Sequence, residues 1–191
     1  MKLKDARKER KIMNVTIDIV HTKGLIGVKM CEVAKRVKIS PSNLYIYFKN
    51  KEDLLRSVFF DTTKKIVKHF DESIPNHPIC KKRIEGVFHF IIQTKVNRSK
   101  EFSFIRQFVQ SPYLEKKDMQ QMDLILKNVF DVFRDGQKEM ILKDDVEIEL
   151  IFALMEGTTS KLVEFQNKGK ITLDKKTLDK SFRMIWDAIR Q

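Results

Sequence analysis

The segment Ser40–Phe48 constrains the fold more than any other part of this chain, because it carries both the start signal and the inner face of a short helix. Ser40 is a favourable N-cap residue, and Pro41 suits the first helical position, where its missing N–H would have no partner anyway. Leu44 and Phe48 then fall on one face of the helix. A second short segment with an apolar face ends just before it. Two short helices joined by so tight a turn predict a helix-turn-helix.

The hydrophobic periodicity of the whole chain predicts an all-α protein of about nine helices. Helices are expected over residues 8–23, 30–37, 41–48, 51–71, 79–96, 100–110, 114–135, 144–167 and 174–190. Pro112, Gly136 and Gly169 are expected to separate helices, and residues 73–78 form the clearest break. We predict a three-helix, helix-turn-helix domain over residues 1–51 and a larger helical domain over residues 52–191.

The charge of the chain is concentrated in this predicted head. Residues 1–51 hold 13 Lys or Arg and 4 Asp or Glu, which places +9 of the net charge of +12 there. A basic head on a nearly balanced body points to a polyanionic partner. A basic run alone is more often a solubilising tail, but within a helix-turn-helix it favours double-stranded DNA. The basic run over Lys4–Lys11 can follow the DNA backbone or enter a minor groove.

The cysteines and the N-terminal residues bear on the compartment. Cys31 and Cys80 are far apart and in unlike contexts, which predicts a reducing environment and no disulfide framework. The segment Met1–Lys8 is charged and lacks the apolar region of a signal peptide. No run approaches the roughly 18 apolar residues of a membrane span. We therefore expect a cytoplasmic protein without a membrane partner.

The start of the predicted recognition helix is expected to enter the major groove of DNA. Asn43 can make a pair of hydrogen bonds with adenine, Ser42 can contact several bases, and Pro41 can touch a thymine methyl group. Tyrosine hydroxyls and lysines nearby suit phosphate contacts, which set the register without reading the sequence. A solvated Asn43 and a core Tyr45 are the alternatives. The predicted DNA-binding residues are Lys29, Ser40, Pro41, Ser42, Asn43, Tyr45, Tyr47 and Lys51.

Several residue pairs fall at a characteristic spacing between residues 12 and 55. They are Lys23-Gly24, Val33-Ala34, Ile39-Ser40, Leu44-Tyr45, Tyr47-Phe48, Lys51-Glu52 and Leu54-Leu55. In this pattern the chain resembles the N-terminal DNA-binding domain of the TetR/AcrR family of bacterial transcriptional regulators. Val28 stands where the family usually has threonine or serine. Lys38 stands where a glycine is common, and that position often needs a left-handed backbone.

The resemblance implies a homodimer on an inverted-repeat operator and a small-molecule effector that moves the recognition helices off their groove spacing. Repression is the commoner mode in the family, so we expect a repressor. A transcriptional activator and a non-specific nucleic-acid-binding protein are the alternatives. The candidate pocket residues are apolar side chains that can equally be core residues, namely Phe59, Phe88, Phe102, Phe108, Met122, Phe130, Phe133, Phe152 and Met155.

The last two predicted helices are apolar around much of their girth, so they are expected to bury two sides. One side can meet the core and the other a partner subunit, although a simply well-buried helix pair has the same pattern. The resemblance implies a four-helix dimer interface here. The candidate interface residues are Ile151, Thr158, Leu162, Phe165, Phe182, Ile185 and Ile189.

An enzyme is the main rival class. The sequence holds no Gly-rich phosphate loop, no Gly-x-Ser-x-Gly elbow and no Cys-x-x-Cys pair. His77-x-x-Cys80, with His69 nearby, lacks a convincing fourth ligand for a metal. We expect no enzymatic activity and no cofactor. Glu156, in the middle of an apolar helix, can neutralise a cationic ligand or pair with a local lysine.

Overall fold

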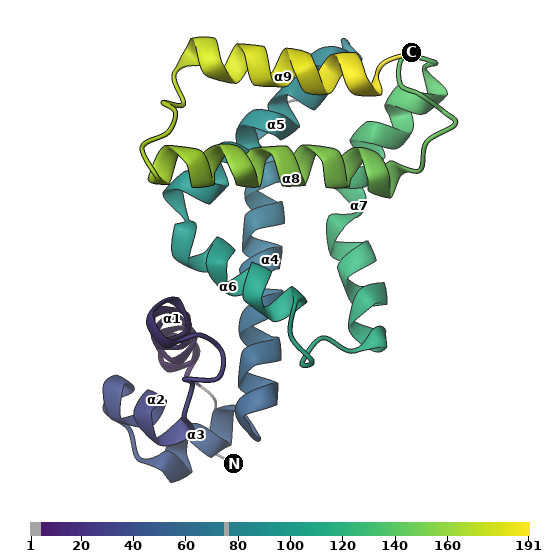
Figure 1. The fold of residues 1–191 in the computed structure, drawn as a ribbon. Helices are drawn as coiled ribbons and strands as arrows, with labels where there is room; N and C mark the ends of the chain where they lie inside the picture. Colours follow the sequence, from purple (N-terminus) through teal and green to yellow (C-terminus); the bar gives the residue numbers. More distant parts are fainter. Residues whose placement is uncertain (1–4, 75–76) are drawn as a thin grey trace. The chain divides into compact units, whose positions relative to one another are not determined.

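The computed structural model describes residues 5–74 and 77–191, and over these residues the chain is all-α, as predicted. Figure 1 shows the helices and their order along the chain. Nine helices lie in the described part, with bounds α1 Ala6–Lys23, α2 Met30–Val37, α3 Pro41–Tyr47, α4 Lys51–Ser73, α5 Cys80–Asn97, α6 Ser99–Val109, α7 Lys116–Lys138, α8 Ile148–Asn167 and α9 Lys175–Ile189. None of them is long and apolar enough to cross a membrane. Residues 75 and 76 of the predicted break lie outside the described residues.

The helices form two compact units. The first contains the chain up to Lys65 together with Ser99–Met122, and the second contains Ile66–Arg98 together with Asp123–Gln191. The long helices α4 and α7 each contribute to both units. The position of the domain boundary after residue 51 stays a prediction.

The first unit is built around α1, α2 and α3, which Figure 1 shows gathered together in purple and dark blue. Each of the three helices contributes a buried side chain, namely Ile12, Val33 and Leu44, and Phe48 just after α3 is buried with them. Helix α6 packs against α1 within this unit. A hydrogen-bonded ion pair of 2.6 Å between Lys100 Nζ and Asp18 Oδ1 joins the two helices at their surface.

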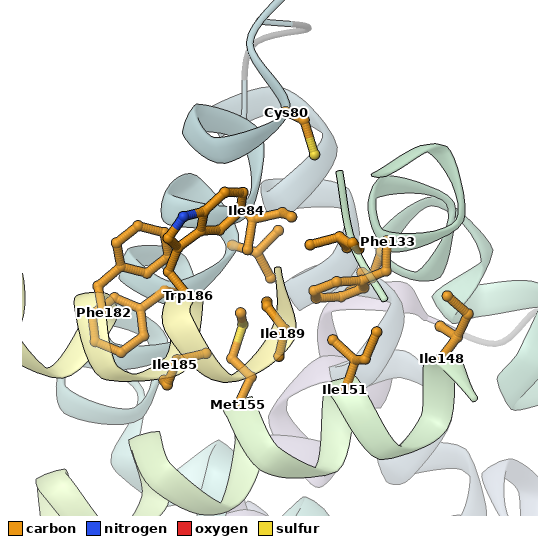
Figure 2. Packing of buried hydrophobic residues seen from close by; sticks show 14 of the residues in the cluster. Cys80, Ile84, Phe133, Ile148, Ile151, Met155, Phe182, Ile185, Trp186 and Ile189 are labelled. Carbon is orange, nitrogen blue, oxygen red and sulfur yellow. The ribbon is translucent and has the colours of Figure 1, made fainter. Parts of the chain in front are cut away.

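The second unit is held together by one apolar core. Figure 2 shows Ile84, Phe133, Ile151 and Met155 turned toward one another, with side chains of α9 closing the cluster. Helix α8 packs against α5 and α9. The chain end is fastened by backbone pairing, because the Lys143 N–H donates to the Ile189 oxygen at 3.0 Å.

Helix α8 begins at Ile148, four residues later than the 144–167 prediction. The side-chain amide of Gln137 donates to the carbonyl oxygens of Lys143 and Val146, both at 2.7 Å. The Lys143 N–H is engaged by Ile189, as described above. These contacts hold the segment before α8 in a non-helical conformation, although its residues could continue the helical pattern.

Gly136 does not separate two helices, which corrects our expectation. It lies in the last turn of α7. A Cβ at this position would come within 2.8 Å of the Leu142 side chain and 3.0 Å of Cys80 Sγ. The glycine therefore serves close packing, and α7 ends two residues later, before Met140 takes a positive φ of 55°.

Candidate nucleic-acid interface

The turn between α2 and α3 has the geometry that the resemblance implied. Lys38 is left-handed, with φ 64° and ψ 48°, as expected for a residue that replaces a common glycine. The Ile39 N–H donates to the Ala34 oxygen at 3.0 Å, which satisfies a carbonyl at the end of α2. The turn therefore closes α2 tightly and fixes the direction in which α3 leaves.

The cap at the start of α3 is also as predicted. Ser40 Oγ accepts a hydrogen bond of 3.2 Å from the Asn43 N–H and lies 2.9 Å from Ser42 Oγ. Leu44 and Phe48 are buried, at 0% and 2% exposure, and they anchor the helix on its inner side. With the helix anchored in this orientation, Pro41, Ser42 and Asn43 are exposed at its start. These side chains are therefore held in place while their outer faces stay accessible to a partner.

The outer face of α3 continues with Tyr45 and Ile46, which are 52% and 45% exposed. Ile46 was not among the predicted contact residues. It follows Ser42 by four positions, so the two share a face of the helix. That spacing was available in the sequence, but an isoleucine in a helix is more readily assigned to the core. An exposed apolar side chain at this position can contact the methyl group of thymine.

Tyr47 has a contact within the first unit. Its hydroxyl oxygen accepts a hydrogen bond of 3.3 Å from the Asp5 N–H, at the start of α1. Asp5 is itself the N-cap of α1, and its carboxylate accepts from the Arg7 N–H at 2.9 Å. Tyr47 thus joins the end of α3 to the start of the basic helix α1. Lys4, from the predicted basic run, lies outside the described residues.

The two lysines of the predicted set have different surroundings. Lys51 Nζ donates to the Ile26 oxygen at 3.2 Å and lies 5.9 Å from the ring centre of Tyr113. It thereby joins the turn before α2 to the connection between α6 and α7. Lys29 is exposed at the N-cap position of α2, where its side chain makes no capping hydrogen bond.

The acid on α2 is neutralised locally. Glu32 pairs with Lys23 and with Arg36, each at 2.8 Å. The hydrogen bond from Lys23, followed by that from Arg36, holds the pKa of the Glu32 carboxyl below its usual value despite partial desolvation. Glu32 therefore stays ionised and paired at neutral pH, and it leaves the surface around α2 and α3 with an excess of positive charge.

Arg56 is a structural residue that sequence reasoning missed. It donates to the Tyr113 oxygen at 3.2 Å and forms hydrogen-bonded ion pairs with Glu115 and Asp118. Desolvation opposes its charge, but the hydrogen bonds and charges of the two carboxylates outweigh it and raise the pKa of Arg56. Its partners lie about sixty positions away along the chain, so no local pattern reveals them.

The predicted pocket residues divide between the two units. Phe59 and Phe108 stack in the first unit with ring centres 4.5 Å apart, and both are fully buried. Phe102 and Met122 are half-buried members of the same unit. The others lie in the second unit, where Phe88, Phe133 and Met155 are buried and Phe130 packs edge-on against Phe152 at 5.2 Å. Their contact with a ligand stays a prediction.

Glu156 pairs with a lysine, as one of the two alternatives had it, but the lysine is not a local one. Its carboxylate Oε1 lies 3.1 Å from Nζ of Lys95, a residue on α5 that is only 4% exposed. The sequence showed a carboxylate out of place in an apolar helix, but the partner stands 61 positions earlier in the chain.

The predicted interface residues also fall into two groups. Ile151, Phe182, Ile185 and Ile189 are 2–3% exposed and belong to the core of the second unit, so they pack within the chain itself. Thr158, Leu162 and Phe165 are half-buried on α8. The more exposed apolar side chains on the same two helices are Leu150, Leu154 and Met184, at 59%, 41% and 74%.

Known proteins resemble this chain over most of its length. A fatty acid metabolism regulator protein of Bacillus subtilis (strain 168) is 21% identical over 168 residues, which cover 82% of this chain and 81% of that protein. An HTH-type transcriptional regulator of Haemophilus influenzae (strain Rd) is 23% identical over 190 residues, or 94% of each chain.

The fold has close counterparts among solved structures. A TetR family transcription regulator from Marinobacter aquaeolei VT8 superposes with a TM-score of 0.90 over 100% of both chains, at 20% identity. Residues 12–58 match the model for bacterial regulatory proteins of the tetR family, and residues 59–191 match that for the tetracyclin repressor-like C-terminal domain. The chain therefore belongs to the tetR family and is a DNA-binding transcriptional regulator.

Proposed function

We propose that the protein is a cytoplasmic homodimeric repressor that binds an inverted-repeat operator and is released from it by a small molecule. The observation that carries the proposal is the exposed start of α3, where Ser42 and Asn43 project from a helix capped by Ser40 and anchored by Leu44. A helix presented in this way can enter the major groove with its first residues against the base edges.

The contacts within one half-site follow from the chemistry of the exposed side chains. Asn43 suits a pair of hydrogen bonds with adenine, and Ser42 can accept from or donate to several bases. Pro41 and Ile46 suit thymine methyl groups. Tyr45, with its exposed phenol, suits a phosphate oxygen. The ammonium groups of Lys29 and Lys51 and the hydroxyl of Tyr47 suit phosphate oxygens as well.

Dimerisation is needed because one recognition helix reads only a few base pairs. Two such helices must be held about 34 Å apart to occupy successive major grooves. The exposed apolar side chains Leu150, Leu154 and Met184 offer a surface on α8 and α9 that a second copy would cover. A hollow of about 210 Å³ lies between the start of α8 and the end of α9, and Leu150 and Leu154 line one side of it.

The effector is proposed to act through linkage. A ligand that releases the operator must bind the DNA-incompetent state more tightly, by the same free energy that DNA affinity loses. The Bacillus subtilis relative is by name a regulator of fatty acid metabolism, so fatty-acid derivatives are the first effector class to screen.

The test is selection from a pool of random DNA duplexes with purified protein, followed by sequencing and titration of the enriched duplex. We expect an inverted repeat whose half-sites are about one helical turn apart. Salt-sensitive binding with no enriched sequence would instead identify a non-specific nucleic-acid binder. Transcription in vitro from a promoter carrying the selected duplex separates the modes, because a repressor lowers the transcript and an activator raises it.

The proposed interface is tested separately. The double substitution Leu154→Glu/Met184→Glu would place charges in the surface that a second copy covers, so we expect monomers and much weaker operator binding. Arg183→Glu is the matched control, because Arg183 is exposed on α9 beside Met184 but faces another direction. Light scattering reports the mass of each variant. A dimeric Leu154→Glu/Met184→Glu double variant would show that the partner binds elsewhere.

A further inference from the structure

One lysine is buried in the interior of the second unit. Lys95 projects from α5, and only 3% of its side chain is exposed. Its ammonium donates to the Glu156 carbonyl oxygen at 2.9 Å, to Thr159 Oγ1 at 2.8 Å and to Ser160 Oγ at 2.6 Å. It also pairs with Glu156 Oε1 at 3.1 Å. Four oxygen atoms from about one turn of α8 thus contact the ammonium group of Lys95.

Stability alone does not account for this cluster. Lysine is almost never fully buried, because its ammonium loses hydration. Replacing a buried ion pair by well-packed apolar residues is often neutral or stabilising. Elsewhere α5 and α8 meet through apolar side chains, such as Phe88 and Met155 in the same core. The position of Lys95 therefore calls for a role other than joining two helices.

The two partners of the ion pair differ in exposure. The Lys95 side chain is enclosed, whereas 40% of the Glu156 side chain is exposed. The Glu156 carboxylate also accepts a hydrogen bond of 2.7 Å from Ser160 Oγ. A half-exposed glutamate can rotate its carboxylate into water, where it is fully hydrated, but the enclosed ammonium cannot follow. The Glu156 carboxylate is thus the exchangeable member of the cluster, and the Lys95 ammonium and the Ser160 hydroxyl are its fixed members.

We propose that Lys95 and Ser160 form a binding site for the carboxylate of an acidic small molecule, which takes the position of the Glu156 carboxylate. The exchange replaces one carboxylate by another, so the buried ammonium keeps an anionic partner throughout. The inference rests on the proposed ligand response, and it names the chemical class of the ligand and the residues that recognise its acidic end.

The neighbouring residues suit an apolar remainder of the ligand. Ile91 lies one turn before Lys95 on α5, and Phe152 lies one turn before Glu156 on α8. Both side chains are half-buried, so they are packed on one side and accessible on another. A carboxylic acid with a hydrocarbon tail would therefore place its head on Lys95 and its tail along these side chains.

The probe is dodecanoate, with dodecanol and methyl dodecanoate as uncharged analogues of matched length and octanoate and hexadecanoate as other chain lengths. Binding to the full-length protein is measured by calorimetry and by the fluorescence of Trp186, the single tryptophan of the chain, which lies in the same core. We expect at least one of the carboxylates to bind, and the uncharged analogues to bind at least about tenfold more weakly.

Two variants give opposite predictions. Lys95→Met removes the ammonium and should weaken carboxylate binding by at least about tenfold. Glu156→Gln removes the internal competitor and should strengthen binding by about tenfold, because the ligand no longer displaces a charged group. If the cluster only joins α5 to α8, Glu156→Gln can weaken the fold but cannot raise affinity. Glu164→Gln is the matched control, since it makes the same change on α8 among surface lysines.

Ser160→Ala is a further variant, in case Lys95→Met fails to fold, and it should weaken carboxylate binding while leaving the uncharged analogues unaffected. The proposal is overturned if no carboxylate binds, if acid and alcohol bind equally, or if Glu156→Gln binds dodecanoate no more tightly than the parent. Operator titrations separate this outcome from the proposed function. Carboxylate binding at Lys95 without operator release would refute the ligand response alone, and operator release by dodecanoate that Lys95→Met leaves unchanged would refute the site alone.

Discussion

Replacing Lys51 tests whether this lysine contacts DNA or only holds the head together. Its ammonium donates to the Ile26 oxygen at 3.2 Å and lies over the Tyr113 ring. An ammonium has three donors, and this contact occupies one of them. Lys51 can therefore hold the turn before α2 and bind a phosphate at the same time. We expect Lys51→Met to weaken binding to all DNA sequences alike.

The magnitude follows from the number of phosphates lost. Each phosphate contact contributes about 0.9 to the slope of log affinity against log salt, so a dimer that loses one contact per protomer loses about 1.8. At about 0.15 M salt this change corresponds to about 30-fold weaker binding, or about 2 kcal/mol. If Lys51 only positions the turn, affinity falls but the slope stays the same.

The assay is fluorescence anisotropy of a labelled operator duplex, titrated at several salt concentrations. Lys64→Met is the matched control, because it removes the same charge from an exposed site on α4 about 20 Å further along the helix, at about 1.5 Å per residue. Its slope should match that of the parent. An unchanged slope in Lys51→Met would refute the phosphate contact and leave Lys51 as a positioning residue.

Three further outcomes are expected. Asn43→Ala should relax the base preference in a repeated duplex selection, because it removes a base-edge contact and leaves the phosphate contacts in place. Gly136→Ala should lower the free energy of unfolding by about 1–3 kcal/mol in urea titrations, because its Cβ would lie within 2.8 Å of buried Leu142. The pKa of Glu164 is lowered to about 2, chiefly by the hydrogen bond from Lys168 and then by that from the lysine three residues earlier. Its ion pairs therefore stabilise the fold above its ordinary pKa of 4.5 and are lost only as pH falls toward 2, which NMR titration of the carboxyl will show.

Local signals in the sequence were sufficient for the helix-turn-helix. The cap at Ser40 and the anchors at Leu44 and Phe48 depend on neighbours only a few positions away, and the structure contains all of them. The left-handed backbone at Lys38 was predictable only through the family resemblance, because a glycine is common at this position in the family whereas a lysine carries no local signal for it. The sequence identified this part of the surface because each of its features is short in range.

The faces of α8 were harder to predict. Successive residues of a helix differ by about 100° in direction, so Leu150 and Ile151 face different sides although they are equally apolar. The structure buries Ile151 in the core and leaves Leu150 exposed at 59%. When a helix is apolar around much of its girth, periodicity shows that two sides are buried but not which one meets the core. Only the packing against α5 and α9 decides this, and those contacts are remote in sequence.

The two anion-binding surfaces proposed for this protein differ in how far their cations are exposed to solvent. The cations around α3, such as Lys29, are exposed, so salt screens each of them and their effect on DNA is additive and steeply salt-dependent. Lys95 is enclosed, and its neutralising partner is already present as Glu156. Exchange of one carboxylate for another leaves the enclosed ammonium with one anionic partner, and salt screens a contact at such a buried group less than it screens the exposed cations. The basic residues of the head were visible as an excess of charge, whereas a single balanced pair contributes nothing to that excess and becomes visible only through its burial.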